Sequence, residues 1–344
     1  MELGSVVFWP AAGAQIGLGH FFRCLALAQE VRGAALCSFF LDMPDPRMQQ
    51  VLDSHDVPYC FRETDDFTKM LRNAQPHMLV IDSPFLPPET VAVARKAASG
   101  LKIVILSDHS PAATEADIVF EPHVVAQWRM PADVSGPEIY RGPDYWILRP
   151  AFDPQLGRMR MTGQNIMRVL IAMGGTDCSH ATLPMGRMVL ASLPQVRVEV
   201  VCGPLFSESK ELAELSRNSN GRLAIFHAPE NMPELMWSAD IAVTAAGYTA
   251  YEFAALGVPM ILWPVEDHQY FTARALSEKG CGIVADQYSL PHALISLAAG
   301  AQAREQMSQG GRALVDGRGR KRVARILLHA LSEAISVAAR CDLD

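Results

Sequence analysis

A histidine preceded by glycines is the feature of this sequence best suited to acid–base chemistry. His20 lies in the segment Gln15–Cys24 and follows Gly17 and Gly19. Glycine lets the backbone turn tightly and approach a ligand closely, and a histidine held beside a ligand can act as a base. His20 is therefore expected to be available as a base. The alternative is a tight turn with a helix-capping histidine.

The elements predicted around His20 place it at the edge of a sheet. The apolar run Val6–Trp9 predicts a buried strand, and the apolar period of Phe21–Val31 predicts a helix. A strand end that leads into a helix N-terminus is the ligand-facing edge of an α/β sheet. The positive end of the helix dipole favours the neutral imidazole, which is the form that accepts a proton.

A second glycine loop has the composition of an anion site. Gly174, Gly175 and Thr176 follow the predicted strand Val169–Met173. Successive backbone N–H groups, with the Thr176 hydroxyl as a further donor, can bind a diphosphate. The spacing matches neither a P-loop nor a dinucleotide fingerprint. Asp177, which comes next, is expected to cap the following helix.

A third block has room for a nucleotide. Small residues that include Gly247 follow the predicted strand Ile241–Thr244. Thr249 can donate a hydrogen bond to a phosphate. Glu252, one turn into the helix, can accept both hydroxyls of a ribose, although the helix dipole alone also favours a glutamate there.

Further polar residues follow other predicted strands. His268 and Gln269 could hydrogen-bond sugar hydroxyls, and the helix start at Met232 could present backbone groups to a flat base, although core packing explains Met232 equally well. Charged residues at strand ends, which turn capping explains as readily, are Asp82, Asp108 and His109.

Composition excludes several classes of protein. The net charge of −7 and the pI near 5.8 argue against nucleic acid as the main partner. No apolar run is long enough to span a bilayer, and the N-terminus lacks the basic start of a signal peptide. The scattered cysteines form no CxxC pair, which favours a cytoplasmic protein with reduced thiols. Neither a metal nor another cofactor is expected.

Strand-like and helix-like runs alternate along the chain, which predicts an α/β fold with parallel sheets. We expect two Rossmann-like domains facing a cleft, at residues 1–152 and 166–337, with a linker at 153–165 and a tail at 338–344. The basic run Arg318–Arg322 is expected to be the solvated start of the helix Val323–Ile335. The predicted strands are Val6–Trp9, Leu36–Leu41, Met78–Ile81, Lys102–Leu106, Ile118–Phe120, Val169–Met173, Val198–Cys202, Leu223–Phe226, Ile241–Thr244, Met260–Trp263 and Gly282–Val284.

Taken together, these stretches resemble the nucleotide-sugar hydrolases of pseudaminic acid synthesis, which act on UDP-2,4-diacetamido-2,4,6-trideoxy-β-L-altropyranose. The chain is similar, more distantly, to the N-acetylglucosaminyl transferase of peptidoglycan synthesis. The segments that carry the resemblance are Gln15–Cys24, with its Ile-Gly-x-Gly-His-x-x-Arg-Cys pattern, Met173–Asp177, Asn231–Asp240, Ala245–Gln269 and Val315–Gly319.

The resemblance implies a glycosyltransferase-B fold, a UDP-sugar substrate without a metal, and hydrolysis with inversion at the anomeric carbon. The free sugar would supply pseudaminic acid for surface or flagellar glycosylation. His20 would be the general base. The residues that would bind the substrate are Gly17, Gly19, Gly174, Gly175, Thr176, Met232, Gly247, Thr249, Glu252, His268 and Gln269.

The chain departs from the family pattern at Trp9–Ala11, where members carry Arg-x-Asp, and at Glu266–Gln269, where Glu-Asn-Gln is commoner. Two alternatives therefore stay open: an inverting glycosyltransferase with an acceptor other than water, and a sugar-nucleotide-binding regulator. Residues 1–150 carry 18 acidic and 12 basic side chains, which disfavours an acceptor on an anionic bilayer.

Overall fold

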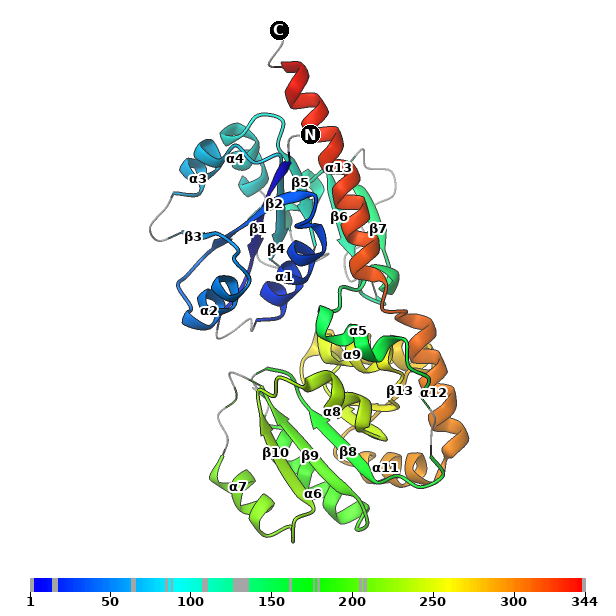
Figure 1. The fold of residues 1–344 in the computed structure, drawn as a ribbon. Coiled ribbons are helices and arrows are strands. Elements are labelled where there is room, and N and C mark those ends of the chain that lie inside the picture. The colour runs from blue at the N-terminus through cyan, green and yellow to red at the C-terminus, as the bar shows by residue number, and fades with distance from the viewer. Residues whose placement is uncertain are drawn as a thin grey trace. The chain divides into compact units, whose positions relative to one another are not determined.

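The computed structural model describes residues 3–13, 18–62, 66–83, 86–87, 89–106, 111–125, 136–160, 163–175, 177, 180–203, 206 and 209–341. The chain forms two compact units. Unit 1 comprises Met1–Arg149 and Arg318–Asp344, and unit 2 comprises Pro150–Gly317. Each unit is an α/β domain with a parallel sheet, as the sequence predicts (Figure 1).

Among the described residues of unit 1, seven strands form a parallel sheet in the order β3-β2-β1-β4-β5-β6-β7. The strands are β1 (Gly4–Pro10), β2 (Ala35–Leu41), β3 (Tyr59–Phe61), β4 (Met78–Asp82), β5 (Lys102–Ile105), β6 (Ile118–Glu121) and β7 (Glu138–Arg141). The helices are α1 (Gly19–Val31), α2 (Pro46–Ser54), α3 (Phe67–Ala74), α4 (Glu89–Ala97) and α13 (Gly319–Cys341), with 3-10 turns at Pro111–Glu115 and Pro143–Tyr145.

The central strands of this sheet are covered on both faces. All five residues of β4 are buried, as expected for a parallel strand between two layers of helices. One core contains Phe8 and Val80 and packs against α1. The other contains Val7 and Ile81 and lies on the opposite face.

The strand order places a switch point between β1 and β4. The chain first builds outward from β1 to β2 and β3, and then returns to the other side of β1 at β4. In open α/β sheets, ligands bind at the carboxyl ends of two neighbouring strands whose following connections run in opposite directions. The strands β1 and β4 are such a pair. Pro10, the last residue of β1, and Asp82, the last residue of β4, lie at this point.

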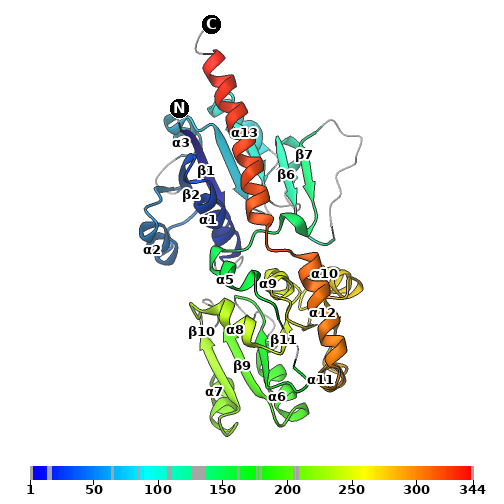
Figure 2. The same ribbon diagram turned by 45° about the vertical axis from the view of Figure 1, so that its right-hand side comes forward.

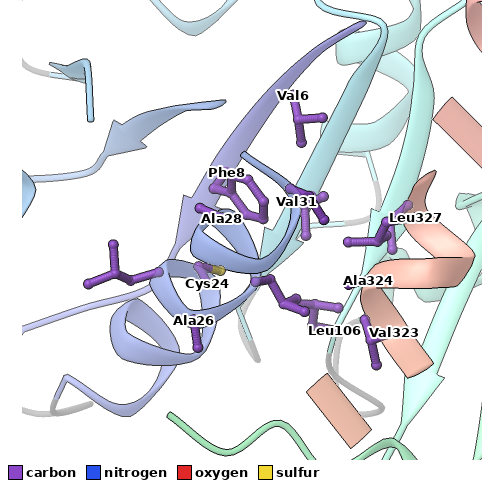
Figure 3. Packing of buried hydrophobic residues seen from close by; sticks show 14 of the residues in the cluster. Val6, Phe8, Cys24, Ala26, Ala28, Val31, Leu106, Val323, Ala324 and Leu327 are labelled. Carbon is purple, nitrogen blue, oxygen red and sulfur yellow. The ribbon is translucent and has the colours of Figure 1, made fainter. Parts of the chain in front are cut away.

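Helix α13 corrects the predicted domain boundaries. Residues 318–344 group with unit 1 and not with the C-terminal domain at 166–337. Val323 and Leu327 are buried in the core that α1 faces, and Figure 3 shows them beside Leu106 and Val31. The apolar stripe of a helix does not indicate which sheet the helix covers. The prediction therefore assigned this helix to the domain that precedes it in the sequence, which is wrong. The helix also adds basic residues to unit 1, so the charge of residues 1–150 alone understates its basic character.

The basic run at the start of α13 is only partly solvated. The Arg320 side chain is buried, and its Nε donates to Oε2 of Glu30 at 2.9 Å while Nη1 donates to the carbonyl of Leu148. The expectation of a wholly solvated helix start is therefore wrong at Arg320, which attaches α13 to α1.

Among the described residues of unit 2, six strands form a parallel sheet in the order β10-β9-β8-β11-β12-β13. The strands are β8 (Arg168–Ala172), β9 (Arg197–Cys202), β10 (Leu223–His227), β11 (Ile241–Thr244), β12 (Met260–Leu262) and β13 (Gly282–Val284). The helices are α5 (Asp153–Leu156), α6 (Thr182–Ser192), α7 (Lys210–Arg217), α8 (Met232–Ser238), α9 (Tyr248–Leu256), α10 (Asp267–Glu278), α11 (Leu290–Ala299) and α12 (Ala301–Leu314), with a 3-10 turn at Pro150–Phe152 (Figure 2).

Unit 2 repeats the topology of unit 1. Its switch point lies between β8 and β11, because β9 and β10 extend the sheet to one side of β8 and β11 to β13 extend it to the other. The predicted linker 153–165 belongs to unit 2 and begins with the short helix α5.

Candidate functional site

The switch point of unit 1 brings together residues far apart in the sequence. Pro10, the last residue of β1, is the register partner of Asp82, the last residue of β4. The backbone N–H of Ala11 donates to the carbonyl oxygen of Asp82 at 2.8 Å. The chain then enters α1, whose second residue is His20. Asp82 and His20 therefore share the carboxyl edge of the sheet.

His20, Asp82 and Arg23 form one buried cluster. Nδ1 of His20 lies 2.7 Å from Oδ1 of Asp82. Arg23, one turn further along α1, donates from Nε to Oδ2 at 2.6 Å and from Nη2 to Oδ1. Nη2 also lies 3.3 Å from Nδ1 of His20. Residues three apart on a helix share a face, so both α1 side chains reach the same carboxylate.

The carboxylate in this cluster is ionised. Burial alone would raise the pKa of Asp82, which is wholly inaccessible to solvent, but the charges of Arg23 and His20 and their hydrogen bonds outweigh burial and lower the pKa to about 2. An ionised carboxylate can only accept a hydrogen bond. Whenever the His20 ring is neutral, its hydrogen is therefore on Nδ1, and Nε2 carries the lone pair.

This arrangement can perform general-base chemistry. A carboxylate that accepts the Nδ1–H of a histidine fixes the tautomer and orientation of the ring and stabilises the imidazolium that forms when Nε2 takes a proton. His20 is only 9% exposed, so its environment is largely shielded from bulk water. The sequence found His20 but gave Asp82 no clear role and Arg23 none.

The glycine loop of unit 2 lies at the switch point of its sheet. Gly174 has φ +101°, a left-handed conformation that favours glycine. A Cβ atom on Gly203, just after β9, would lie 2.5 Å from backbone atoms of Gly175. The loop after β8 thus packs against the backbone after β9, and the absence of a side chain at Gly203 makes that approach possible.

Asp177 supports the start of α6 as expected, although the N-cap residue of this helix is Ala181 and not Asp177. Its carboxylate accepts hydrogen bonds from the backbone N–H groups of Ala181 and Thr182 at 3.0 and 3.1 Å. Ala181 is the N-cap residue and Thr182 the first residue of α6, and backbone N–H groups at a helix start have no intrahelical partners. Asp177 is buried and has φ +46°. It therefore stabilises the turn that follows the glycine loop.

Helix α9 begins beside the glycine loop. It follows β11, the neighbour of β8, and Thr244 Oγ1 donates to the carbonyl of Ala172 at 2.7 Å across the two strands. Gly247 is the N-cap residue, and among the described residues no side chain caps this helix end. Thr249 and Glu252 lie in its first turns and are half-buried. A helix N-terminus beside a glycine loop is suited to an anion.

Two other predicted residues lie at separate helix starts of unit 2. Gln269 lies in the first turn of α10, after β12, and its Oε1 accepts the backbone N–H of Val265 at 3.1 Å. Part of its hydrogen-bonding capacity therefore holds its own loop. Met232 is the first residue of α8, which follows the edge strand β10, and it is half-buried.

The remaining predicted residues are accounted for as follows. Gly19 begins α1. Gly17, Thr176, Asp108 and His109 lie outside the described residues, as does the side chain of His268. Among the described residues, no group of His, Cys, Asp and Glu side chains is arranged to hold a metal ion. None of the described helices has the length and apolar character needed to cross a membrane.

Part of unit 2 is similar to a known protein family. Residues 189–310, which cover most of unit 2, match the model of the glycosyltransferase family 28 C-terminal domain. The solved structure of MurG from Acinetobacter baumannii is similar to 94% of this chain and 98% of its own, with a TM-score of 0.65 and 16% identity. The fold is the glycosyltransferase-B fold. The structure of LpCGTa in complex with UDP is similar to 96% of this chain and 100% of its own, with a TM-score of 0.69 and 14% identity.

Two curated relatives extend over most of the chain. The spore coat polysaccharide biosynthesis protein SpsG of Bacillus subtilis is 25% identical over 334 residues, 92% of this chain and 95% of SpsG. The uncharacterised protein MJ1062 of Methanocaldococcus jannaschii is 26% identical over 258 residues, 72% of this chain. That match spans only 53% of MJ1062.

Proposed function

We propose that this protein is a UDP-sugar hydrolase that releases UDP and a free sugar with inversion at the anomeric carbon. The observation that carries the proposal is the contact between His20 and the ionised Asp82, which prepares Nε2 to accept a proton. The fold, the family 28 match and the similarity to a UDP complex support a UDP-sugar as the substrate.

In the proposed reaction, Nε2 of His20 takes a proton from water as the water oxygen bonds to the anomeric carbon. The bond between that carbon and the phosphate oxygen breaks, and UDP leaves with the electron pair. Asp82 stabilises the imidazolium until the proton passes to solvent. A positioned base of this kind contributes about 10²–10⁴ in rate.

Unit 2 is proposed to bind the UDP part of the substrate. Its glycine loop, with Gly174, Gly175 and Thr176, and the N-terminus of α9, with Gly247 and Thr249, would meet the charge of the departing diphosphate. Preorganised N–H groups and a helix N-terminus do this without reorganising in the transition state. Glu252 would accept the ribose hydroxyls.

The sugar and the uracil of the substrate would contact the remaining predicted residues. His268 and Gln269 would contact the sugar, Met232 would lie near the uracil, and Gly17 and Gly19 would bring the backbone close to the substrate. The proposed sugar is a 2,4-diacetamido-2,4,6-trideoxyhexose, on the resemblance of Gln15–Cys24 to the pseudaminic acid hydrolases.

A glycosyltransferase is the second candidate. Trp9–Ala11 lacks the family's Arg-x-Asp, and both MurG and SpsG are similar along nearly the whole chain. In this reading the same base would remove a proton from the hydroxyl of an acceptor in place of water.

Incubation of the purified chain with a panel of UDP-sugars, followed by NMR, tests the proposal. Hydrolysis predicts UDP and an inverted free sugar from a UDP-2,4-diacetamido sugar without any acceptor. Release of UDP only when an acceptor is added would support the transferase, and binding without turnover would support a regulator. Either of these results would overturn the proposal that the protein is a hydrolase.

A further inference from the structure

A second carboxylate at the carboxyl edge of the unit 1 sheet is oriented by a buried tryptophan. Nε1 of Trp9, in β1, donates to Oδ1 of Asp42 at 3.1 Å. Trp9 is 5% exposed. Its ring packs against the rings of Phe40 and Phe67, with centroid distances of 5.4 and 4.6 Å. The indole that orients the carboxylate is therefore itself fixed in the core.

Asp42 lies at the same edge of the sheet as Asp82. It directly follows Leu41, the last residue of β2. Pro10 of β1 is level with Asp82 of β4, and it is also level with Leu41 when the register of β1 with β2 is continued. Asp42 is therefore one residue beyond that level and two strands from Asp82, about 10 Å along the edge.

Asp42 and His20 lie on opposite sides of the strand ends. The Trp9 side chain, which binds Asp42, belongs to the core on the face opposite α1. His20 lies on α1 and contacts Asp82. A ligand at the carboxyl ends of the strands can therefore contact His20 from one side and Asp42 from the other.

Arg62 gives the Asp42 carboxylate a cationic neighbour. It directly follows Phe61, the last residue of β3, and its Nη1 lies 3.6 Å from Oδ1 of Asp42. The Arg62 side chain is 62% exposed and the Asp42 side chain 35%. An ion pair this exposed contributes little to stability, and both side chains can reach a ligand.

A carboxylate next to a guanidinium is complementary to a hydroxyl group. The carboxylate only accepts hydrogen bonds and the guanidinium only donates them, whereas a hydroxyl does both. From the described residues, Oδ2 of Asp42 accepts no hydrogen bond. One hydroxyl can thus donate to Asp42 and accept from Arg62.

We propose that Asp42 and Arg62 bind a hydroxyl of the sugar in the substrate, on the side of the ring away from the anomeric carbon, and so determine which sugar is accepted. The inference deepens the proposed function and rests on it for the identity of the substrate. Binding of the sugar can be measured without turnover.

The test is calorimetry in the His20→Ala background with two probes, UDP and UDP-2,4-diacetamido-2,4,6-trideoxyhexose. Asp42→Asn keeps an oxygen that can accept from Trp9 but loses the charge. We expect it to raise the dissociation constant of the sugar nucleotide about 10–100-fold and to leave that of UDP unchanged. An unchanged affinity for the sugar nucleotide, or an equal loss for UDP, would overturn the proposal.

Arg62→Met tests whether the two side chains bind the same group. It should also weaken binding of the sugar nucleotide and not of UDP. Asp42→Asn/Arg62→Met should lose about as much affinity as the weaker-binding single variant, because losses at one shared hydroxyl do not add. Fully additive losses would contradict a shared hydroxyl.

Glu115→Gln is the matched control for the loss of one negative charge. Glu115 is exposed and lies just before β6, at the opposite edge of the same sheet. Its substitution should leave both dissociation constants unchanged. A loss as large as that in Asp42→Asn would show a general effect of charge and overturn the proposal.

Steady-state kinetics with His20 in place separate this inference from the proposed function. In Asp42→Asn, KM should rise while kcat stays near that of the parent, because the contact is made in the ground state and the transition state alike. A parent that binds the sugar nucleotide but releases no UDP would contradict the proposed function. The calorimetry would still decide the role of Asp42.

Discussion

Nδ1 of His20 lies 2.7 Å from Oδ1 of Asp82, although 62 positions separate the two residues in the sequence. The contact crosses the switch point between β1 and β4. It converts a histidine after a glycine loop into an oriented base, because the ionised carboxylate determines which ring nitrogen carries the hydrogen.

Replacing Asp82 by asparagine should impair turnover more than binding. The amide would keep the size of the side chain but lose the charge that stabilises the imidazolium and fixes the tautomer. We expect kcat for UDP release to fall about 10²-fold or more, with the dissociation constant of UDP unchanged. Steady-state kinetics and calorimetry of UDP binding measure the two effects. A variant as fast as its parent would exclude the orienting role.

Asp82 should make the free energy of unfolding depend on pH in the acid range. Its pKa of about 2 lies below the value of about 3.9 in an unfolded chain, so the ionised group stabilises the folded state above that pH, and this contribution is lost as the pH falls toward 2. Between about pH 5 and pH 2, the parent should lose about 2 kcal/mol more than Asp82→Asn in its free energy of unfolding. Urea titrations across this range measure the difference, and parallel curves would contradict the prediction.

The fold class and most strands could be predicted from the sequence. Buried parallel strands such as β4, whose first four residues Met78–Ile81 are all apolar, can be recognised from the apolar run alone. Tyr59–Phe61 and Glu138–Arg141 were missed because they are short edge strands with half-buried or exposed side chains. Their apolar content does not distinguish them from loops.

The site was predictable only in part. His20 follows a glycine loop between a strand and a helix, and that pattern is local. Asp82 ends a strand, where an aspartate is equally expected as a turn cap. Its pairing with α1 depends on which strand lies beside β1, which is information that the sequence alone does not contain.

The sequence also does not show which sheet the C-terminal helix α13 covers, and for that reason its predicted domain was wrong. A substitution in the core of unit 1 tests its observed position. Leu327 of α13 is 2% exposed in the core of unit 1. Leu327→Ala should cost about 2–5 kcal/mol and lower the hydrogen-exchange protection of β1 and α1, with little change in unit 2. Ser332→Ala, at an exposed position of the same helix, is the control. Loss of protection in β8 and β11 would contradict the assignment.

The glycine contact of unit 2 gives a separate prediction. In Gly203→Ala the new Cβ would clash with the backbone of Gly175, so the loop must move at a cost of about 1–3 kcal/mol. We expect weaker UDP binding, measured by calorimetry. Gly157→Ala is the matched control, because no atom lies within 4 Å of its Cβ position. Equal UDP affinities for the two variants would argue against the glycine loop as the diphosphate site.

The most direct measurement of the central claim is UDP release by His20→Ala, compared with the parent on the same UDP-sugar and paired with UDP affinity. A base held by Asp82 predicts a loss of about 10²–10⁴ in kcat, while the dissociation constant of UDP stays that of the parent. An alanine variant that releases UDP as fast as its parent would contradict the account.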